Sequence, residues 1–344
     1  MKQTWLWLGI SLAVVVLALW GGLVLLPHWL QQTADPDPAS YRQPYLSTDE
    51  QSFTTVYYTT GDKRYLLPLT IPINNTREVA KIALEKLLAG PPDEFSSSVI
   101  PEGTKLRDVY MVGDTIFVDL TKDFLEVGEE EAQAAVDCIV QTVLPVTSRY
   151  LLQIMVEGQV CPELAGTDIS LPLDDTPFNI LNPQEAPKGK DICLITAYFC
   201  DEYAMYLVPV SIAMPRDLLM AAEDPELFLA RETIELLLLG PDEDSGLFAT
   251  FYPGAQLLSL EIKESIAYVN LSAEALDYGG GAAFEQLFVK SLVYSLTDLT
   301  GINAVQILIE GEIEQYLPEG MDVSTPIFPY DKINEPFQRA GGYN

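Results

Sequence analysis

The chain has 344 residues, and its 50 acidic and 19 basic side chains give a formal net charge of −31 at pH 7. Apolar residues make up 48% of it, enough for a sizeable core, and the length favours two domains at roughly 150 residues each. The excess of acid excludes nucleic acid and anionic lipid headgroups as partners of most of the chain, because both require a basic surface.

The first predicted element is a membrane-spanning helix within residues 1–30. Residues 5–26 carry no charge, and crossing the hydrocarbon layer takes about 20 apolar residues. A cleaved signal peptide would have a shorter apolar core of roughly 7 to 15 residues. Lys2 precedes the span and acidic residues follow it, so the positive-inside rule predicts a cytoplasmic N-terminus and export of the remainder. The expected interfacial anchors are Trp5, Trp7 and Trp29.

Two segments without a hydrophobic period are expected to be linkers. Residues 31–52 connect the span to the next domain and contain several prolines, which favour an extended chain. Residues 173–191 are rich in proline, polar and charged residues and divide the rest of the chain in two. The predicted domains are therefore residues 53–172 and 192–337.

These two domains repeat the same series of elements. Each begins with two strands, at 56–71 and 196–212, and the second strand ends in an aliphatic-Pro-aliphatic triplet. A helical pattern follows at 76–91 and 228–241, with apolar residues spaced by three and four. Glycine and then proline are expected to end each helix, at Gly90 and Pro91 in the first copy and at Gly240 and Pro241 in the second.

The second half of each copy is also repeated. A β-hairpin is predicted at 100–121 and again at 252–272, beginning near Gly103 and Gly254. A second helix follows, at about 129–144 and 282–299. The last strand then ends in "IMVEG" or "ILIEG", which places Glu157–Gly158 and Glu310–Gly311 at equivalent positions. The predicted fold class is α+β, with two tandem modules of order β-β-α-β-β-α-β.

The recurrence of "LL.GP", "P.G..L" and a terminal hydrophobic-Glu-Gly in both copies resembles the GerMN domain family. The resemblance implies a fold like that of ring-building-motif domains, and a role in assembling or positioning an envelope complex during sporulation. It also implies location in a bacterial cytoplasmic membrane, with homo-oligomerisation left open. No cysteine precedes Cys138, so a lipobox is absent and anchoring is expected through the N-terminal helix as a single-pass span.

Little in the sequence supports catalysis, a cofactor or a metal. The single histidine, His28, lies at the end of the predicted span, which excludes a histidine base or a histidine-ligated metal in the exported part. The glycine-rich stretch 278–286 lacks the spacing of a phosphate-binding loop. Metal-ligand spacing is also absent from the cysteines, which allow three complete disulfide pairings or free buried thiols: Cys138, Cys161, Cys193 and Cys200.

Two alternative functions remain open. A carboxylate-based hydrolase of cell-wall glycans could use Glu157 and Glu310, but their carboxyl groups would have to lie roughly 5 to 9.5 Å apart. A glycan-binding module would need an aromatic groove, for which the candidates are Tyr57, Tyr58, Tyr198 and Phe199. Because the glutamates recur with the whole module, we expect neither to be catalytic, and we predict a non-enzymatic protein that docks onto an envelope complex.

Overall fold

The computed structural model describes residues 52–181 and 192–337. The predicted membrane span, with Trp5, Trp7 and Trp29, lies outside these residues, as do most of the first expected linker and residues 182–191 of the second. Within the two described ranges, no helix combines the length and the apolar character needed to cross a membrane.

The first module starts with an antiparallel hairpin and ends with a mixed sheet. Strand β1 (Ser52–Thr60) pairs with β2 (Leu66–Ile73), and α2 (Val79–Leu88) follows. After the two-residue strand β3 (Ser96–Ser97), β4 (Leu106–Val112) pairs antiparallel with β5 (Thr115–Leu120). Helix α3 (Ala132–Val143) then crosses over to β6 (Leu151–Val156), which lies parallel to β5.

The second module repeats this order. The hairpin β10 (Ile192–Cys200) and β11 (Leu207–Pro215) precedes α5 (Pro225–Leu239). Strands β12 (Leu257–Lys263) and β13 (Ile266–Leu271), helix α6 (Gly281–Thr297) and strand β14 (Ala304–Ile309) complete it, with β14 parallel to β13. The chain is therefore mixed α+β in two tandem copies, as the sequence predicts.

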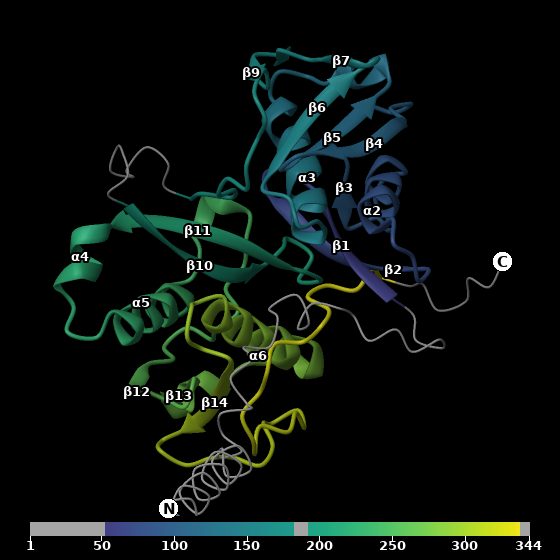
Figure 1. The fold of residues 1–344 in the computed structure, drawn as a ribbon. Helices are drawn as coiled ribbons and strands as arrows, with labels where there is room; N and C mark the ends of the chain where they lie inside the picture. Colours follow the sequence, from purple (N-terminus) through teal and green to yellow (C-terminus); the bar gives the residue numbers. More distant parts are fainter. Residues whose placement is uncertain (1–51, 182–191, 338–344) are drawn as a thin grey trace, which may run out of the picture. The chain divides into compact units, whose positions relative to one another are not determined.

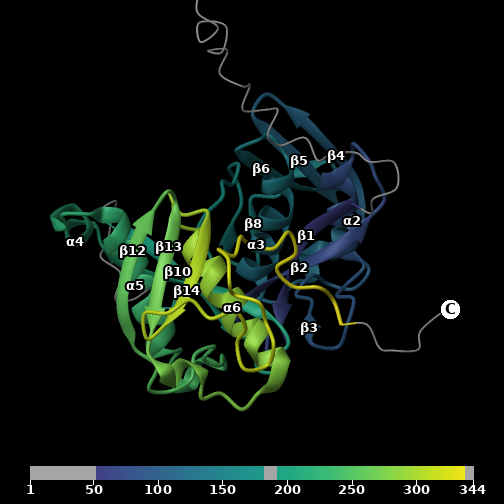
Figure 2. The same cartoon turned by 90° about the horizontal axis from the view of Figure 1, so that it is seen from below.

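Each module has three layers, with two helices packed between a hairpin and a sheet (Figures 1 and 2). In the first module α2 and α3 lie against β1; in the second, α5 and α6 lie between β10 and the sheet β12–β13–β14. The helix layer buries apolar side chains where it meets the strands: Ala83, Leu84, Ile139, Ile234 and Leu292 all have no exposed surface. Burial on two sides explains why these helices show apolar residues over a wide face.

The helix boundaries differ from those expected, for local reasons. Helix α2 begins only at Val79, and no side chain caps it. Helix α5 begins three residues before the predicted start, because the Asp224 carboxylate accepts the backbone N–H of Leu227 and Pro225 occupies the first turn. A short helix, α4 (Arg216–Ala221), was not predicted and is specific to the second module.

Candidate functional site

The two repeated glutamates directly follow equivalent strands of their own modules, β6 and β14. Glu157 follows β6 with φ of 53°, and Glu310 follows β14 with φ of 50°, so both lie in the left-handed region. The next residue, Gly158 or Gly311, also has a positive φ, of 78° or 88°. Two consecutive left-handed residues turn the chain sharply at the strand end, and glycine adopts this conformation without strain.

The glutamate side chains bind backbone groups close to them. Glu157 Oε1 accepts the N–H of Lys122 at 3.0 Å, and Glu310 Oε1 accepts the N–H of Ala273 at 2.9 Å. Each donor N–H lies at the start of a 3₁₀ helix, Lys122–Glu126 or Ala273–Leu276, whose first N–H groups have no partner within the helix. Each glutamate is thus a cap supplied from another part of its module.

The following glycine is held in an equivalent way in both modules. The N–H of Gly158 donates to Asp119 Oδ1 at 2.9 Å, and the N–H of Gly311 donates to Asn270 Oδ1 at 2.8 Å. In the first module, Arg107 Nη1 adds ion pairs to Asp119 and Glu157, at 3.2 and 3.3 Å. The two glutamates therefore have different partners, each within its own module.

The other repeated residues lie at chain reversals. Gly90 and Gly240, with φ of 88° and 77°, follow the ends of α2 and α5. The next residues, Pro91 and Pro241, cannot continue a helix. Gly103 and Gly254 have φ of 91° and 100° in the turns before β4 and β12. These positions shape the module and place no reactive group.

The two modules meet through the outer edges of β2 and β11, which are edge strands of their own sheets. Each strand carries a proline, Pro68 or Pro209, opposite a tyrosine of its partner strand, Tyr57 or Tyr198. Proline has no N–H to donate to a neighbouring strand, so a continuous ladder between the two edges is prevented. Several polar groups of these edges pair instead with the side chains and backbone of the two tails.

Two asparagines provide this contact. Asn179, which follows the first module, accepts the N–H of Leu66 at 2.8 Å and donates Nδ2–H to the carbonyls of Leu66 and Pro209, both at 2.8 Å. Asn334, which follows the second module, accepts the N–H of Leu207 at 2.9 Å and donates to the carbonyls of Leu207 and Pro68, both at 2.8 Å. The contacts are reciprocal, as in a two-fold interface.

The backbone around the asparagines is reciprocal too. Ser211 of β11 donates its N–H to the Asn179 carbonyl at 3.0 Å, and Thr70 of β2 donates to the Asn334 carbonyl at 2.7 Å. Each module's tail therefore pairs with the edge strand of the other module, and Figure 1 shows the C-terminal tail (yellow) passing beside β2. The described part of the expected linker, residues 173–181, is consequently held in place and is not a free spacer.

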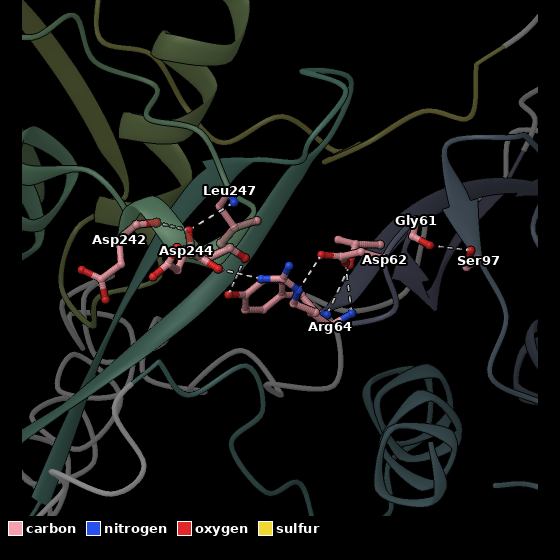
Figure 3. Close-up of polar contacts among 10 residues, drawn as sticks. Gly61, Asp62, Arg64, Ser97, Asp242, Asp244 and Leu247 are labelled. Atoms are coloured by element: carbon pink, nitrogen blue, oxygen red, sulfur yellow. Dashed lines mark hydrogen bonds and ion pairs between the residues drawn. The ribbon is translucent and has the colours of Figure 1, made fainter. Parts of the chain in front are cut away.

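The tips of the two hairpins reach across to the opposite module. Arg64 donates Nη1–H to the carbonyl of Asp244 at 2.7 Å and pairs through Nε with Asp62 at 2.9 Å (Figure 3). Beside it, Tyr65 donates its hydroxyl to the carbonyl of Ser245 at 3.1 Å. Figure 3 also shows the Ser97 hydroxyl, which donates to the Gly61 carbonyl at 3.2 Å. This hydrogen bond fixes the base of the same hairpin tip.

The second hairpin makes the matching contact in the other direction. The Tyr206 hydroxyl binds Asp93 Oδ2 and accepts the N–H of Phe337 at 2.9 Å. Phe95 lies edge-on to Tyr203 and to Phe337, with ring centroids 5.4 Å apart in both pairs. Because both tips and both tails cross the interface, the two modules are joined by four separate sets of contacts.

A groove remains between the modules beside these contacts. It has two parts, of about 490 and 430 Å³, and the same three residues line both: Tyr57, Tyr198 and Asp298. Asp298 Oδ2 accepts the Tyr198 hydroxyl at 2.7 Å. The surrounding protein raises the pKa of the Asp298 carboxyl group through desolvation, while the Tyr198 hydrogen bond partly lowers it.

Two of the four aromatic residues expected for glycan binding line this groove. Tyr57 and Tyr198 do so, whereas Tyr58 and Phe199 point into the module cores and are almost fully buried. Sequence analysis missed Asp298, Asn179 and Asn334. In the sequence these three residues stand out only as polar residues at a helix end or in a proline-rich segment. Polar residues are common at such solvent-exposed positions.

Buried acids and thiols elsewhere serve the local structure. Glu285, 1% exposed, accepts the Tyr278 hydroxyl at 2.5 Å and the N–H groups of Glu319 and Met321, at 2.7 and 2.8 Å. All four cysteines are free thiols. In the described ranges, no group of three or more His, Cys, Asp or Glu side chains is placed to hold a metal ion.

Comparison with known proteins relates both modules to one family. The model of the family Germane, described as "Sporulation and spore germination", matches residues 55–160 and 196–315. The chain is 24% identical over 328 residues to the spore germination protein GerM of Bacillus subtilis (strain 168), covering 88% of this chain and 84% of that protein. The resemblance to the GerMN family is thereby confirmed.

A solved structure of the tandem GerMN domains of sporulation protein GerM from Bacillus subtilis superposes with a TM-score of 0.63 at 21% identity. The match covers 82% of this chain and 99% of the solved one. At this level of identity the likeness establishes the fold, and it extends across both modules.

Proposed function

This chain belongs to the Germane family of sporulation and spore germination proteins, and from that membership we propose that it is a non-enzymatic envelope protein that helps to assemble a sporulation complex. Its two GerMN domains act together as one docking body. The proposed partner is an envelope protein complex. Nucleic acid has no part in this function, because the chain is strongly acidic.

The observation that carries the proposal is the reciprocal interface between the modules. Tails and hairpin tips cross it in both directions, and the Asn334 side chain that closes it is 5% exposed. A buried amide with all of its bonds satisfied favours a single arrangement of the two domains. A fixed spacing between two docking surfaces suits a protein that positions components of a larger assembly.

We propose a non-enzymatic role because of the way the two repeated glutamates are hydrogen-bonded. Each carboxylate accepts a backbone N–H of its own module, Lys122 or Ala273, and is therefore engaged in holding a 3₁₀ helix. A general acid and its partner would instead face each other across a substrate cleft. No described contact favours the glycan hydrolase over the docking protein.

Membrane anchorage is also part of the proposal. The uncharged range 5–26 would cross the cytoplasmic membrane once, with Lys2 on the cytoplasmic side and both modules outside. Tethering confines the docking body to a surface, which raises its effective concentration toward a membrane-bound partner. Reporter fusions at the C-terminus test this topology, since an active cytoplasm-only reporter at that end would contradict it.

The function is tested by deleting the gene in its host and counting heat-resistant spores after complementation. We expect the natural chain and the double variant Glu157→Gln, Glu310→Gln to restore spores. A chain whose residues 1–30 are replaced by a cleaved signal peptide should restore few. Immunoblots confirm equal protein levels in each strain. Failure of a stable, well-expressed double variant would overturn the non-enzymatic reading, and unaltered sporulation in the deletion strain would reject the sporulation role.

A further inference from the structure

The two modules differ along the strand that forms one edge of each sheet. Strand β4 in the first module and β12 in the second are outermost, so one side of each has no neighbouring strand among the described residues (Figure 1). The registers with β5 and β13 place residues 110–112 of β4 at the positions of residues 261–263 of β12. Because both copies have the same fold, a difference between these edges is not required by the architecture.

The β4 edge is apolar where the β12 edge is charged. Tyr110, Met111 and Val112 are between 39% and 60% exposed. In β12 the first and third of these positions are Glu261 and Lys263, whose side chains form an ion pair. Charged side chains protect a free edge from pairing with another strand, because the second strand would have to desolvate them. Strand β12 has this protection, and the end of β4 lacks it.

The exposed apolar surface continues onto the segment before β6. Tyr150 is 78% exposed, and Arg149 beside it donates Nε–H to Met111 Sδ at 3.4 Å. The register of the last strand in each sheet makes Ile302 and Asn303 the equivalent residues of the second module. Ile302 is buried and Asn303 is polar, so the second copy shows no such apolar extension at these two positions. Contiguous exposed apolar side chains rimmed by charged groups are typical of an interaction surface.

A groove of about 520 Å³, here called the β4 groove, lies between β4 and the start of α2. Its apolar lining consists of Val79, Ala80, Leu106, Val109, Met111, Ile116 and Val146. Helix α2 begins only at Val79, whereas α5 begins a turn earlier and supplies Leu227 and Phe228 to the hydrophobic core. Val109 is consequently half-buried, while its equivalent in β12, Leu260, is buried. The first module therefore leaves part of its edge strand uncovered.

Basic side chains surround the β4 groove, although the chain has a net charge of −31. Arg77, Lys81 and Arg107 line it, and Arg149 contacts Met111 of the lining. The second module has apolar residues in place of the three arginines: Leu227, Leu258 and Ile302. The arginines are thus a property of the first module and are not needed for the shared fold.

Two of these cations have no acidic partner. Arg107 pairs with acids of its own module, and Lys81 pairs with Glu78 at 3.5 Å. Arg77 and Arg149 form no ion pair with a described residue. The acids that also line the groove are Glu78, Glu85 and Asp108. The free charges at this edge are therefore guanidinium groups, which bind carboxylates in preference to other side chains.

The uncovered side of β4 also offers backbone hydrogen-bonding groups. The β4–β5 hairpin closes at Val112 and Thr115 around a two-residue turn. Hydrogen-bonded and non-bonded pairs alternate along an antiparallel ladder, so the backbone groups of Val109 and Met111 point away from β5. The Val109 N–H is bound by the side chain of its neighbour Asp108, at 2.9 Å. An extended chain laid along this side binds such groups as a strand does in a sheet.

We propose that the free edge of β4 is the docking site for an extended, acidic segment of a partner protein, which adds to the sheet as a further strand. Its backbone pairs with Val109 and Met111, its apolar side chains enter the β4 groove, and its carboxylates pair with Arg77 and Arg149. The inference rests on the proposed docking function, because it names the surface by which the envelope partner is held.

Fluorescence anisotropy of a labelled strand-forming peptide, measured with the purified full-length chain in detergent, tests the site. The probe is acetyl-EVTVEVTVE-amide, and its counterpart acetyl-KVTVKVTVK-amide has lysine in place of each glutamate. The acidic peptide should bind saturably and at least about tenfold more tightly than the lysine peptide. Non-specific binding to a chain of net charge −31 would give the opposite order.

Two matched proline variants test strand addition. Met111→Pro removes an outward N–H of β4 and should weaken binding of the acidic peptide by about tenfold or more. Ile262→Pro makes the same change at the equivalent position of β12 and should leave the affinity unchanged. Equal losses in the two variants would overturn the assignment to β4. Sedimentation that shows a dimer of the chain, dissociated by Met111→Pro, would overturn the partner assignment in favour of a second copy.

A charge reversal keeps the test valid if Met111→Pro lowers the melting temperature. Arg77→Glu should weaken binding of the acidic peptide by about tenfold. Lys86→Glu makes a comparable change on α2 at an exposed position outside the β4 groove and should have no effect. Equal effects of these two variants, or tighter binding of the lysine peptide, would overturn the proposal.

Spore counts separate this inference from the function on which it rests. Normal heat-resistant spores from Arg77→Glu, in a host whose deletion strain lacks them, would overturn the β4 docking site and leave the sporulation role intact. Unaltered sporulation in the deletion strain would reject the sporulation role. Loss of peptide binding in Arg77→Glu but not in Lys86→Glu would support the β4 site in either case.

Discussion

Asn334 makes toward strand β2 the contacts that Asn179 makes toward strand β11. Each side chain accepts the N–H and caps the carbonyl of a leucine in its own module, Leu207 or Leu66. Each also donates to the carbonyl of a proline in the other module. The interface is therefore closed by two equivalent amides, one from each tail, where prolines prevent direct pairing of the strands.

Replacing Asn334 with alanine should lower the free energy of unfolding by about 2–4 kcal/mol, because three backbone groups at the interface lose their partner. Urea unfolding followed by fluorescence measures the change. Asn303→Ala is the matched control, since Asn303 is exposed and its side chain makes none of these contacts; it should change stability by less than about 0.5 kcal/mol. Equal effects of the two variants would contradict the role given to Asn334.

Glu157→Gln and Glu310→Gln should each cost about 0.5–2 kcal/mol, because an amide oxygen still accepts the N–H of Lys122 or Ala273 but more weakly than a carboxylate does. Glu157→Gln also loses the ion pair with Arg107, which is partly exposed and worth little. Thermal unfolding in parallel with a Glu314→Gln control measures both. A loss above about 4 kcal/mol in either variant would indicate a buried role that the geometry does not explain.

Asp298 should make stability depend on pH. Its pKa is raised above the usual 3.8, chiefly by desolvation, so the folded state disfavours the charged carboxylate. The contribution to stability is fully present below about 3.8 and is lost as the pH rises through the raised pKa. Asp298→Asn should therefore be more stable than the natural chain at about pH 7.5, and the advantage should disappear near pH 4. An equal advantage at both values would contradict this assignment.

Thiol titration should separate the free cysteines from any disulfide. Cys138, Cys161 and Cys200 are buried and Cys193 is partly exposed. Burial raises the pKa of the Cys200 thiol to about 12 and raises that of Cys138 further, which suppresses the reactive thiolate. A thiol reagent should react with Cys193 alone in the folded chain and with all four cysteines after unfolding. Recovery of only two thiols in denaturant without reductant would reveal a disulfide.

The sequence by itself determined the module. Apolar spacing, the glycine and proline at Gly240 and Pro241, and the repeated Glu–Gly pair are local signals, and each reports on residues within a few positions of itself. Repetition strengthened them, because an element weakly indicated in one copy could be checked against the other. The α+β class and the tandem arrangement therefore followed without knowledge of any contact between the copies.

Tertiary structure alone decided how the copies meet. Asn179 lies in a proline-rich stretch that has the composition of a linker, and its partner Pro209 belongs to another module, so neither carries a local signal for the other. The same holds for Asp298, which becomes part of a groove only because Tyr57 is brought beside it from the first module. Edge strands offer unpaired backbone groups to any neighbour, and which neighbour satisfies them depends on packing across the whole chain, a property that local periodicity does not encode.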